Sequence, residues 1–217
     1  MSGIVWPALG GAVGEPLVFL LVGGAAVVAG LARGGVLRGL ARTGLRHRRL
    51  GLVCLAVQAV VVALPLQAVG LPLGLGALLL AVALAVLLAV ARPNGRLAGV
   101  PLIALGLLLN LVAVVANAGM PTSEATLARA GVAVSRPLPH RPDAKHVLGQ
   151  GTRLGLLGDR LAVRPLRAVV SYGTVCELAG LFLLVQYLLL AAAAGRRDDA
   201  AHGAHEARTV PWGTWAD

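Results

Sequence analysis

Residues 72–91 contain no polar side chain, and this stretch limits the possible folds more than any other feature. A helix needs about 20 consecutive apolar residues to cross the hydrocarbon core of a bilayer. Comparable apolar stretches lie at 16–32, 50–68, 99–118 and 169–194. Because apolar runs of this length are typical of membrane spans, we expect an all-α membrane protein with a five-helix transmembrane bundle.

The composition of the chain also favours a membrane protein over a soluble domain. Hydrophobic residues make up 58% of the chain and charged residues 13%. Soluble domains are about half apolar and about one quarter charged. The net charge of +10 comes from arginines in the links between apolar stretches, where membrane topology explains them. We therefore expect no nucleic-acid partner.

The arginines also predict how the chain is threaded. The link at 33–49 carries six arginines, and basic links of this kind stay in the cytoplasm. This places the chain in the bacterial cytoplasmic membrane with its N-terminus outside and its C-terminus inside. The expected segments are an outer N-terminus (1–15), four transmembrane helices (16–117), an outer loop (118–167), a fifth helix (168–194) and a disordered inner tail (195–217).

Three arginines of the basic link, Arg38, Arg42 and Arg46, recur every four residues. One reading is an amphipathic segment that lies on anionic lipids. The other reading is a topology signal alone, because the glycines in this link disfavour a helix by about 1 kcal/mol each. Anionic lipids are accordingly one expected partner.

The outer loop at 118–167 is the only part that we expect to form a water-facing region. Thr122 or Ser123 is placed to cap a short helix after the break in the fourth span. Apolar residues then alternate around Gly158 and Asp159, which predicts a small β-hairpin. We expect the short helix and the hairpin to lie over the outer mouth of the bundle.

Few polar side chains interrupt the apolar stretches, so each is a candidate for a role. Asn110 and Asn117 lie seven residues apart on one helical face. With Gln58, they either hydrogen-bond between helices or line a substrate site. Glu177 lies inside the last stretch, where an ionisable group costs at least about 2.5 kcal/mol. It either faces the bundle interior or lies near the interface beside a loop arginine.

His140, Asp143 and His146 are the candidate metal ligands. Their regular spacing offers ligand types that zinc uses. Neighbouring prolines prevent a helix that would orient the ligands, so the alternative is an ordinary polar loop. We expect no other cofactor, because the chain lacks a phosphate-binding glycine motif and a nucleophile elbow.

Five short motifs resemble one known family. They are Leu-Ala-Arg-Gly-Gly at 31–35, Asn-Ala-Gly-Met-Pro-Thr-Ser at 117–123, Lys145-His146, Thr-Arg-Leu-Gly-Leu-Leu-Gly-Asp at 152–159 and Ser-Tyr-Gly at 171–173. Together they resemble DUF5317, a family of uncharacterised bacterial multi-pass membrane proteins. The resemblance implies a membrane location and a similar outer loop, and it assigns no activity.

The resemblance also directs attention to particular residues. The functional or ligand-binding candidates are Asn110, Asn117, Met120, Pro121, Ser123, Asp159, Ser171 and Glu177. The family pattern has Asp directly after Ser-x-Gly, where this chain has Thr174. We hypothesise that Glu177, three residues further along the same helix face, takes the role of that acid.

Three classes of function are compatible with these features. The first is a non-enzymatic interaction or accessory protein, or a bundle that binds a lipid-like ligand, acting as a homo-oligomer or with a membrane-protein partner. The second is a small transporter or channel subunit, although an odd number of spans and few polar residues do not favour it. The third is a membrane hydrolase with a metal at His140, Asp143 and His146.

Overall fold

The computed structural model describes residues 9–37, 46, 49, 73–132, 145–147 and 151–209. The predicted second span at 50–68, with Gln58, and most of the basic link, with Arg38 and Arg42, lie outside the described residues. The described α-helices are α1 (Leu9–Ala32), α4 (Leu73–Ala91), α5 (Val100–Asn117), α6 (Glu124–Arg129) and α7 (Tyr172–Thr209). The protein is therefore mostly helical, as predicted.

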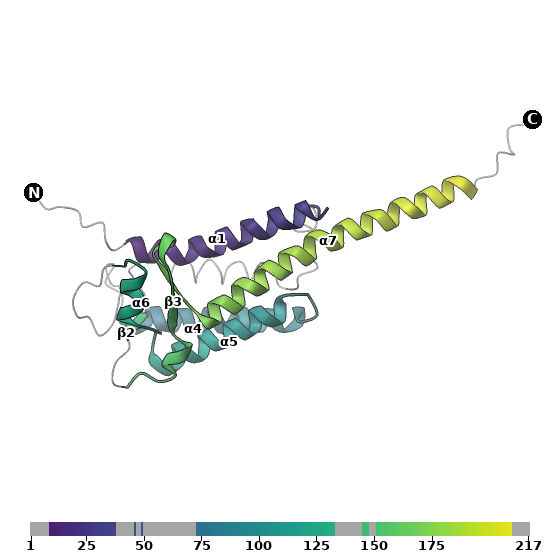
Figure 1. The fold of residues 1–217 in the computed structure, drawn as a ribbon. Coiled ribbons are helices and arrows are strands. Elements are labelled where there is room, and N and C mark those ends of the chain that lie inside the picture. Colours follow the sequence, from purple (N-terminus) through teal and green to yellow (C-terminus); the bar gives the residue numbers. More distant parts are fainter. Residues whose placement is uncertain are drawn as a thin grey trace, which may run out of the picture.

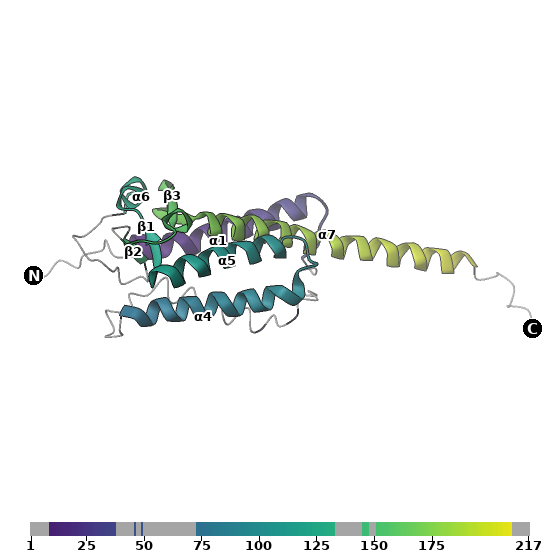
Figure 2. The same ribbon diagram turned by 90° about the horizontal axis from the view of Figure 1, so that it is seen from below.

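The long helices pack side by side, with α5 between α4 and α7 (Figure 2). Helix α1 packs along α7 (Figure 1). Helix α5 begins after Gly99, has a proline in its first turn and ends where Ala118 adopts a left-handed conformation with φ 51°. These are the boundaries that proline and glycine predict for this helix.

Three of these helices are long and apolar enough to cross a membrane, through Gly14–Ala32, Val100–Asn117 and Tyr172–Gly195. A shorter apolar helical segment, Ala81–Asn94, runs from α4 into the 3-10 turn Arg92–Asn94. Large apolar side chains on these helices face outward, among them Leu20 (72% exposed) and Val115 (67% exposed). An apolar exterior of this kind suggests a membrane protein.

A four-stranded sheet lies at one end of the helices, and the prediction of an all-α fold with one hairpin missed most of it. The strands are β1 (Met120–Thr122), β2 (Lys145–Val147), β3 (Asp159–Val163) and β4 (Ala168–Ser171), in the spatial order β2-β1-β3-β4. Strand β1 is parallel to both β2 and β3, and β3 is antiparallel to β4. The sheet therefore joins three segments that are distant in the sequence.

A β-hairpin is present, but it is not the predicted one, because residues 153–158 form no strand. It joins β3 to β4 through the 3-10 turn Arg164–Leu166, rather than folding back at Gly158 and Asp159. A Cβ at Gly158 would overlap the backbone carbonyl oxygen of Pro121, so this glycine permits close contact with β1. The fifth helix accordingly begins at Tyr172 and not near residue 168, because buried Val169 and Val170 belong to β4.

Two further predictions concern helix ends. Ser123 is the N-cap residue of α6, as expected, although its side chain makes no capping hydrogen bond. A disordered tail was expected from residue 195, whereas α7 continues to Thr209 and projects past the other helices (Figure 1). The alanines of this segment have high helix propensity, which explains the continuation.

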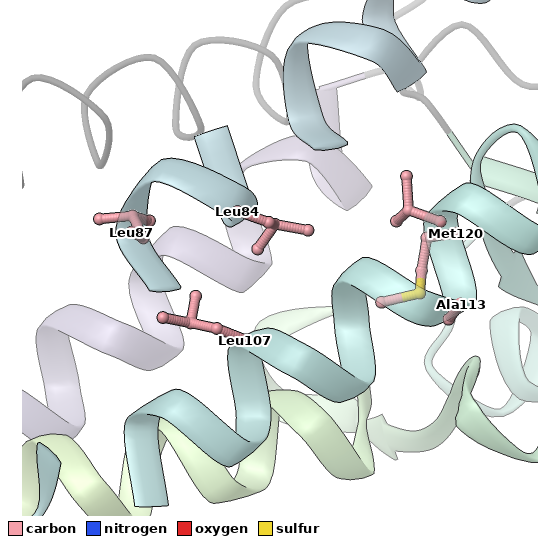
Figure 3. Packing of buried hydrophobic residues seen from close by; sticks show 6 residues of the cluster. Leu84, Leu87, Leu107, Ala113 and Met120 are labelled. Carbon is pink, nitrogen blue, oxygen red and sulfur yellow. The ribbon is translucent and has the colours of Figure 1, made fainter. Parts of the chain in front are cut away.

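Leucines from α4 and α5 form the main apolar core. Figure 3 shows Leu84 and Leu87 on α4 facing Leu107 on α5, with Met120 beside Ala113. Met120, a predicted site residue, is thus a buried core residue at the start of β1. A second core lies under α6, where Leu127, Ala130 and Val132 pack against Val169 of β4.

Candidate functional site

Glycines allow α5 and α7 to approach closely. A Cβ at Gly106 would overlap the Gly173 carbonyl oxygen, and one at Gly99 would overlap that of Gly180. The order of these contacts reverses between the two helices, so α5 and α7 are antiparallel. Gly99 and Gly106 are seven residues apart, and so are Gly173 and Gly180. This spacing keeps the two glycines of each helix on one face. The sequence showed this spacing, but the prediction did not use it.

Four buried polar side chains meet beside this contact: Asn110 on α5, Ser171 at the end of β4, and Thr174 and Glu177 on α7. We call them the polar cluster. Asn110 Nδ2 donates to Glu177 Oε1 at 2.7 Å, and Ser171 Oγ donates to Asn110 Oδ1 at 2.6 Å. Three of the four residues were predicted candidates, and Asn110 joins two of them.

The start of α7 organises this cluster. Ser171 immediately precedes the helix, and its Oγ accepts a 2.9 Å hydrogen bond from the backbone N–H of Thr174. This is the N-cap arrangement that serine favours. The hydroxyls of Ser171 and Thr174 also lie 3.0 Å apart. The prediction missed Thr174 as a member, although a serine three residues before it was a usable signal.

Glu177 as a residue is only 6% exposed, so burial removes most of its contact with solvent. Burying an ionisable group is costly unless partners compensate, and Asn110 supplies one donor. Gly106 packs directly on Glu177, since a Cβ at this glycine would lie only 2.6 Å from Glu177 Cγ. Thr174 and Glu177 belong to one cluster, which is compatible with the hypothesis that Glu177 replaces the family's acid; that hypothesis stays a prediction.

Asn117 does not join the cluster, although it shares a helix face with Asn110. Its Nδ2 donates to the carbonyl oxygens of Ala113 and Arg153, both at 2.8 Å. The backbone N–H of Arg153 donates to Asn117 Oδ1, also at 2.8 Å. The amide therefore both donates to and accepts from the Arg153 backbone, and it fastens the segment around Arg153 to the end of α5.

Asn94 repeats this arrangement near the end of α4, and the prediction missed it. Its Nδ2 donates to the carbonyl oxygens of Val90 at 2.7 Å and Arg46 at 3.1 Å. Its Oδ1 accepts from the Arg46 backbone N–H at 2.9 Å. Each asparagine thus bonds the carbonyl four residues earlier and the backbone of one distant arginine. An asparagine at a helix end was the available signal.

Asp159 and Thr122 form a second polar contact, inside the sheet. They are paired residues of β3 and β1, and Thr122 Oγ1 donates to Asp159 Oδ2 at 3.0 Å. Both side chains are almost completely buried. Pro121 is also buried and lies in register with His146 of β2. This contact between paired residues holds β1 and β3 together.

The metal prediction is not tested by the structure. His140 and Asp143 lie outside the described residues, and only the backbone of His146 is described, in β2. Within the described part of the chain, no group of three His, Cys, Asp or Glu residues could hold a metal ion.

Gln186 forms a further buried contact that sequence reasoning missed. Its Nε2 donates to the Ala26 carbonyl oxygen at 2.6 Å, which links α7 to α1. Arg33 Nη1 donates to Gln186 Oε1 at 3.2 Å. A lone glutamine inside an apolar stretch was the signal.

These features define a class of protein: apolar helices of membrane-spanning length that carry a small mixed sheet at one end. The chain belongs to a family of unknown function (DUF5317), whose profile matches residues 42–186. This confirms the resemblance drawn from the sequence motifs. The match contains the whole polar cluster and the sheet, and it leaves out α1 and the motif at 31–35. No curated protein and no solved structure matches the chain.

Proposed function

We propose that the protein is a non-enzymatic component of the bacterial cytoplasmic membrane that holds a small extracytoplasmic platform for binding another membrane protein. The platform is the four-stranded sheet together with α6. The observation that carries the proposal is the polar cluster, because it bonds the last residue of β4 to both α5 and α7.

Several contacts support a platform that is rigidly attached to the helices. Strand β4 passes into α7 without an intervening residue, and β1 begins two residues after Ala118, the C-cap of α5. Asn117 adds a third attachment through the backbone of Arg153. A sheet held at three points presents a fixed surface, which favours recognition of a partner over large movement.

The polar cluster itself supports a structural role over catalysis or transport. A transport path or an active site needs polar groups that a substrate can reach. Asn110, Ser171, Thr174 and Glu177 are instead buried and bonded to one another. Interhelical bonds of this kind typically stabilise membrane bundles by about 0.6–2 kcal/mol each.

The exposed face of α6 is the part of the platform that is easiest to test. Its residues Ala125 and Ala128 are exposed, whereas Leu127 is buried against the sheet. A photoreactive amino acid at either alanine in living bacteria is expected to give one discrete protein adduct. The same amino acid at Val115, on the apolar exterior of α5, is the matched control and is expected to give none.

Identification of the adduct by mass spectrometry distinguishes a second copy of this chain from another membrane protein. Failure of both α6 positions to give a protein adduct would refute the platform. Native mass spectrometry of the detergent-released protein then separates the alternatives. A stoichiometric small molecule would favour a lipid-binding bundle or transporter, and a bound metal would favour the hydrolase with His140, Asp143 and His146.

A further inference from the structure

The segment 153–157 places two leucines on the surface beside the end of α5. We call it the leucine turn; it contains the 3-10 helix Gly155–Leu157. Leu156 is 74% exposed and Leu154 is 53% exposed, whereas Leu157 packs against the core formed by α4 and α5. Leu156 is the most exposed large apolar side chain among the described residues. Two neighbouring leucines in water would be unfavourable, so their surroundings need an explanation.

The position of the turn along the helices supplies one explanation. Asn117 holds the backbone of Arg153 through two 2.8 Å hydrogen bonds. Asn117 is also the last residue of the apolar span Val100–Asn117. The leucine turn is therefore fixed at the level where this span ends. In a bilayer this level is the boundary between the hydrocarbon core and the headgroups.

The conformation and the charges of the turn agree with this location. Leu154 adopts a left-handed backbone conformation, with φ 51°, which is unusual for a residue with a Cβ. Arg153 is exposed on one side, and Arg160 Nε donates to the Gly155 carbonyl oxygen at 2.9 Å on the other. Leucines flanked by arginines match a layer in which acyl chains meet phosphates.

We propose that the leucine turn inserts Leu154 and Leu156 into the headgroup–acyl boundary of the bilayer, with Arg153 and Arg160 directed to lipid phosphates. The occupant of this surface is the lipid bilayer and not a protein. The inference rests on the membrane location in the proposed function. It adds a second lipid contact, at the opposite end of α5 from Arg46, which is one of the three arginines in the predicted lipid contact.

The test measures how deep the turn lies in the full-length chain. Single cysteines replace Leu156, Val115 or Ala128 in a background without Cys54 and Cys176, and each is labelled with an environment-sensitive fluorophore. The proteins are reconstituted in vesicles of phosphatidylethanolamine and phosphatidylglycerol. Spin-labelled lipids quench fluorophores in the bilayer, and aqueous iodide quenches fluorophores in water. Circular dichroism checks that each variant is folded.

We expect spin-labelled lipid to quench the label at Leu156, and iodide to quench it at least about tenfold less than the label at Ala128. The label at Val115 reports membrane embedding independently. Lipid quenching at Val115 with full iodide quenching at Leu156 would overturn the inference and leave the proposed function intact. Iodide quenching at Val115 would instead overturn the membrane location on which both depend.

A charge variant provides the second measurement. The double variant Arg153→Gln, Arg160→Gln is expected to increase iodide quenching of the Leu156 label by about twofold in these vesicles, because each arginine near an anionic surface contributes to membrane binding. The matched control is Arg96→Gln, an exposed arginine in the link before α5. Equal iodide quenching in the double variant and the unchanged chain would refute the assigned role of the two arginines.

Discussion

Replacing Asn110 with alanine removes the side chain that joins the polar cluster. Asn110 donates to Glu177 at 2.7 Å and accepts from Ser171 at 2.6 Å, and all three side chains are buried. Alanine keeps the helix, because it has the highest helix propensity. It also adds no atoms near Gly173, where a Cβ would overlap Asn110 Oδ1. The loss is therefore confined to hydrogen bonding and a small cavity.

The expected cost follows from these contacts. Asn110 makes one side-chain hydrogen bond to α7 and one to the end of β4, and such bonds contribute about 0.6–1.7 kcal/mol each in membrane bundles. The substitution also leaves the Glu177 carboxyl without this donor, and an unsatisfied buried polar group costs about 1–3 kcal/mol. Since these contributions overlap, we expect Asn110→Ala to lower the free energy of unfolding by about 2–4 kcal/mol.

This change is measured by reversible unfolding in lipid bicelles, with steric trapping as the readout. Glu177→Gln is the matched control, because its amide oxygen still accepts from Asn110 and its volume is nearly unchanged. We expect it to cost less than about 1 kcal/mol if Glu177 acts as a hydrogen-bond acceptor. A change below about 0.5 kcal/mol for Asn110→Ala would refute the structural role of the cluster. A large effect of Glu177→Gln on function with normal stability would support the hypothesis of a replaced acid.

Three further predictions test other contacts. Gly106→Val is expected to prevent close packing of α5 on α7 and to lower the free energy of unfolding by at least about 3 kcal/mol. The control is Gly195→Ala, because a Cβ at Gly195 meets no atom within 4 Å, and we expect a change below about 1 kcal/mol. Unfolding in bicelles compares the two variants. Thr122→Val removes the donor to Asp159 and is expected to lower the free energy of unfolding by about 1–3 kcal/mol. The sheet should then be cut faster by protease while the helices stay protected. Equal rates of sheet proteolysis in the variant and the unchanged chain would contradict this role. A single cysteine at Ala128 is expected to react with an impermeant maleimide in intact cells, and reaction only after lysis would invert the proposed topology.

Local signals predicted much of the helical part of the chain. The apolar stretch at 99–118 predicted α5, and Ser123 was one of two expected caps for α6. Asn110 and Glu177 were identified because polar groups in apolar helices are costly, and the structure brings them together. The sequence could not show that Asn110 bonds to Glu177, because 67 residues separate them.

Long-range pairing explains most of what the sequence did not reveal. Strand β1 is three residues long and pairs with Lys145–Val147 and Asp159, so no local alternation indicated it. Buried Val169 and Val170 read equally well as the start of an apolar helix. The contact of Gly106 with Gly173 could not be predicted. The only signal was the seven-residue spacing of glycines in each helix, and small residues are abundant throughout the chain.

The continuity of α7 has a mechanical consequence. Its 38 residues span about 57 Å at about 1.5 Å per residue, which is nearly twice the hydrocarbon thickness of about 30 Å. One end is bonded to the sheet through Ser171, and the other end reaches Thr209. A straight rod tilted by about 10° about its centre moves each tip by about 5 Å in opposite directions. A movement of the sheet together with Ser171 therefore also moves the far end of α7, because one continuous helix joins them.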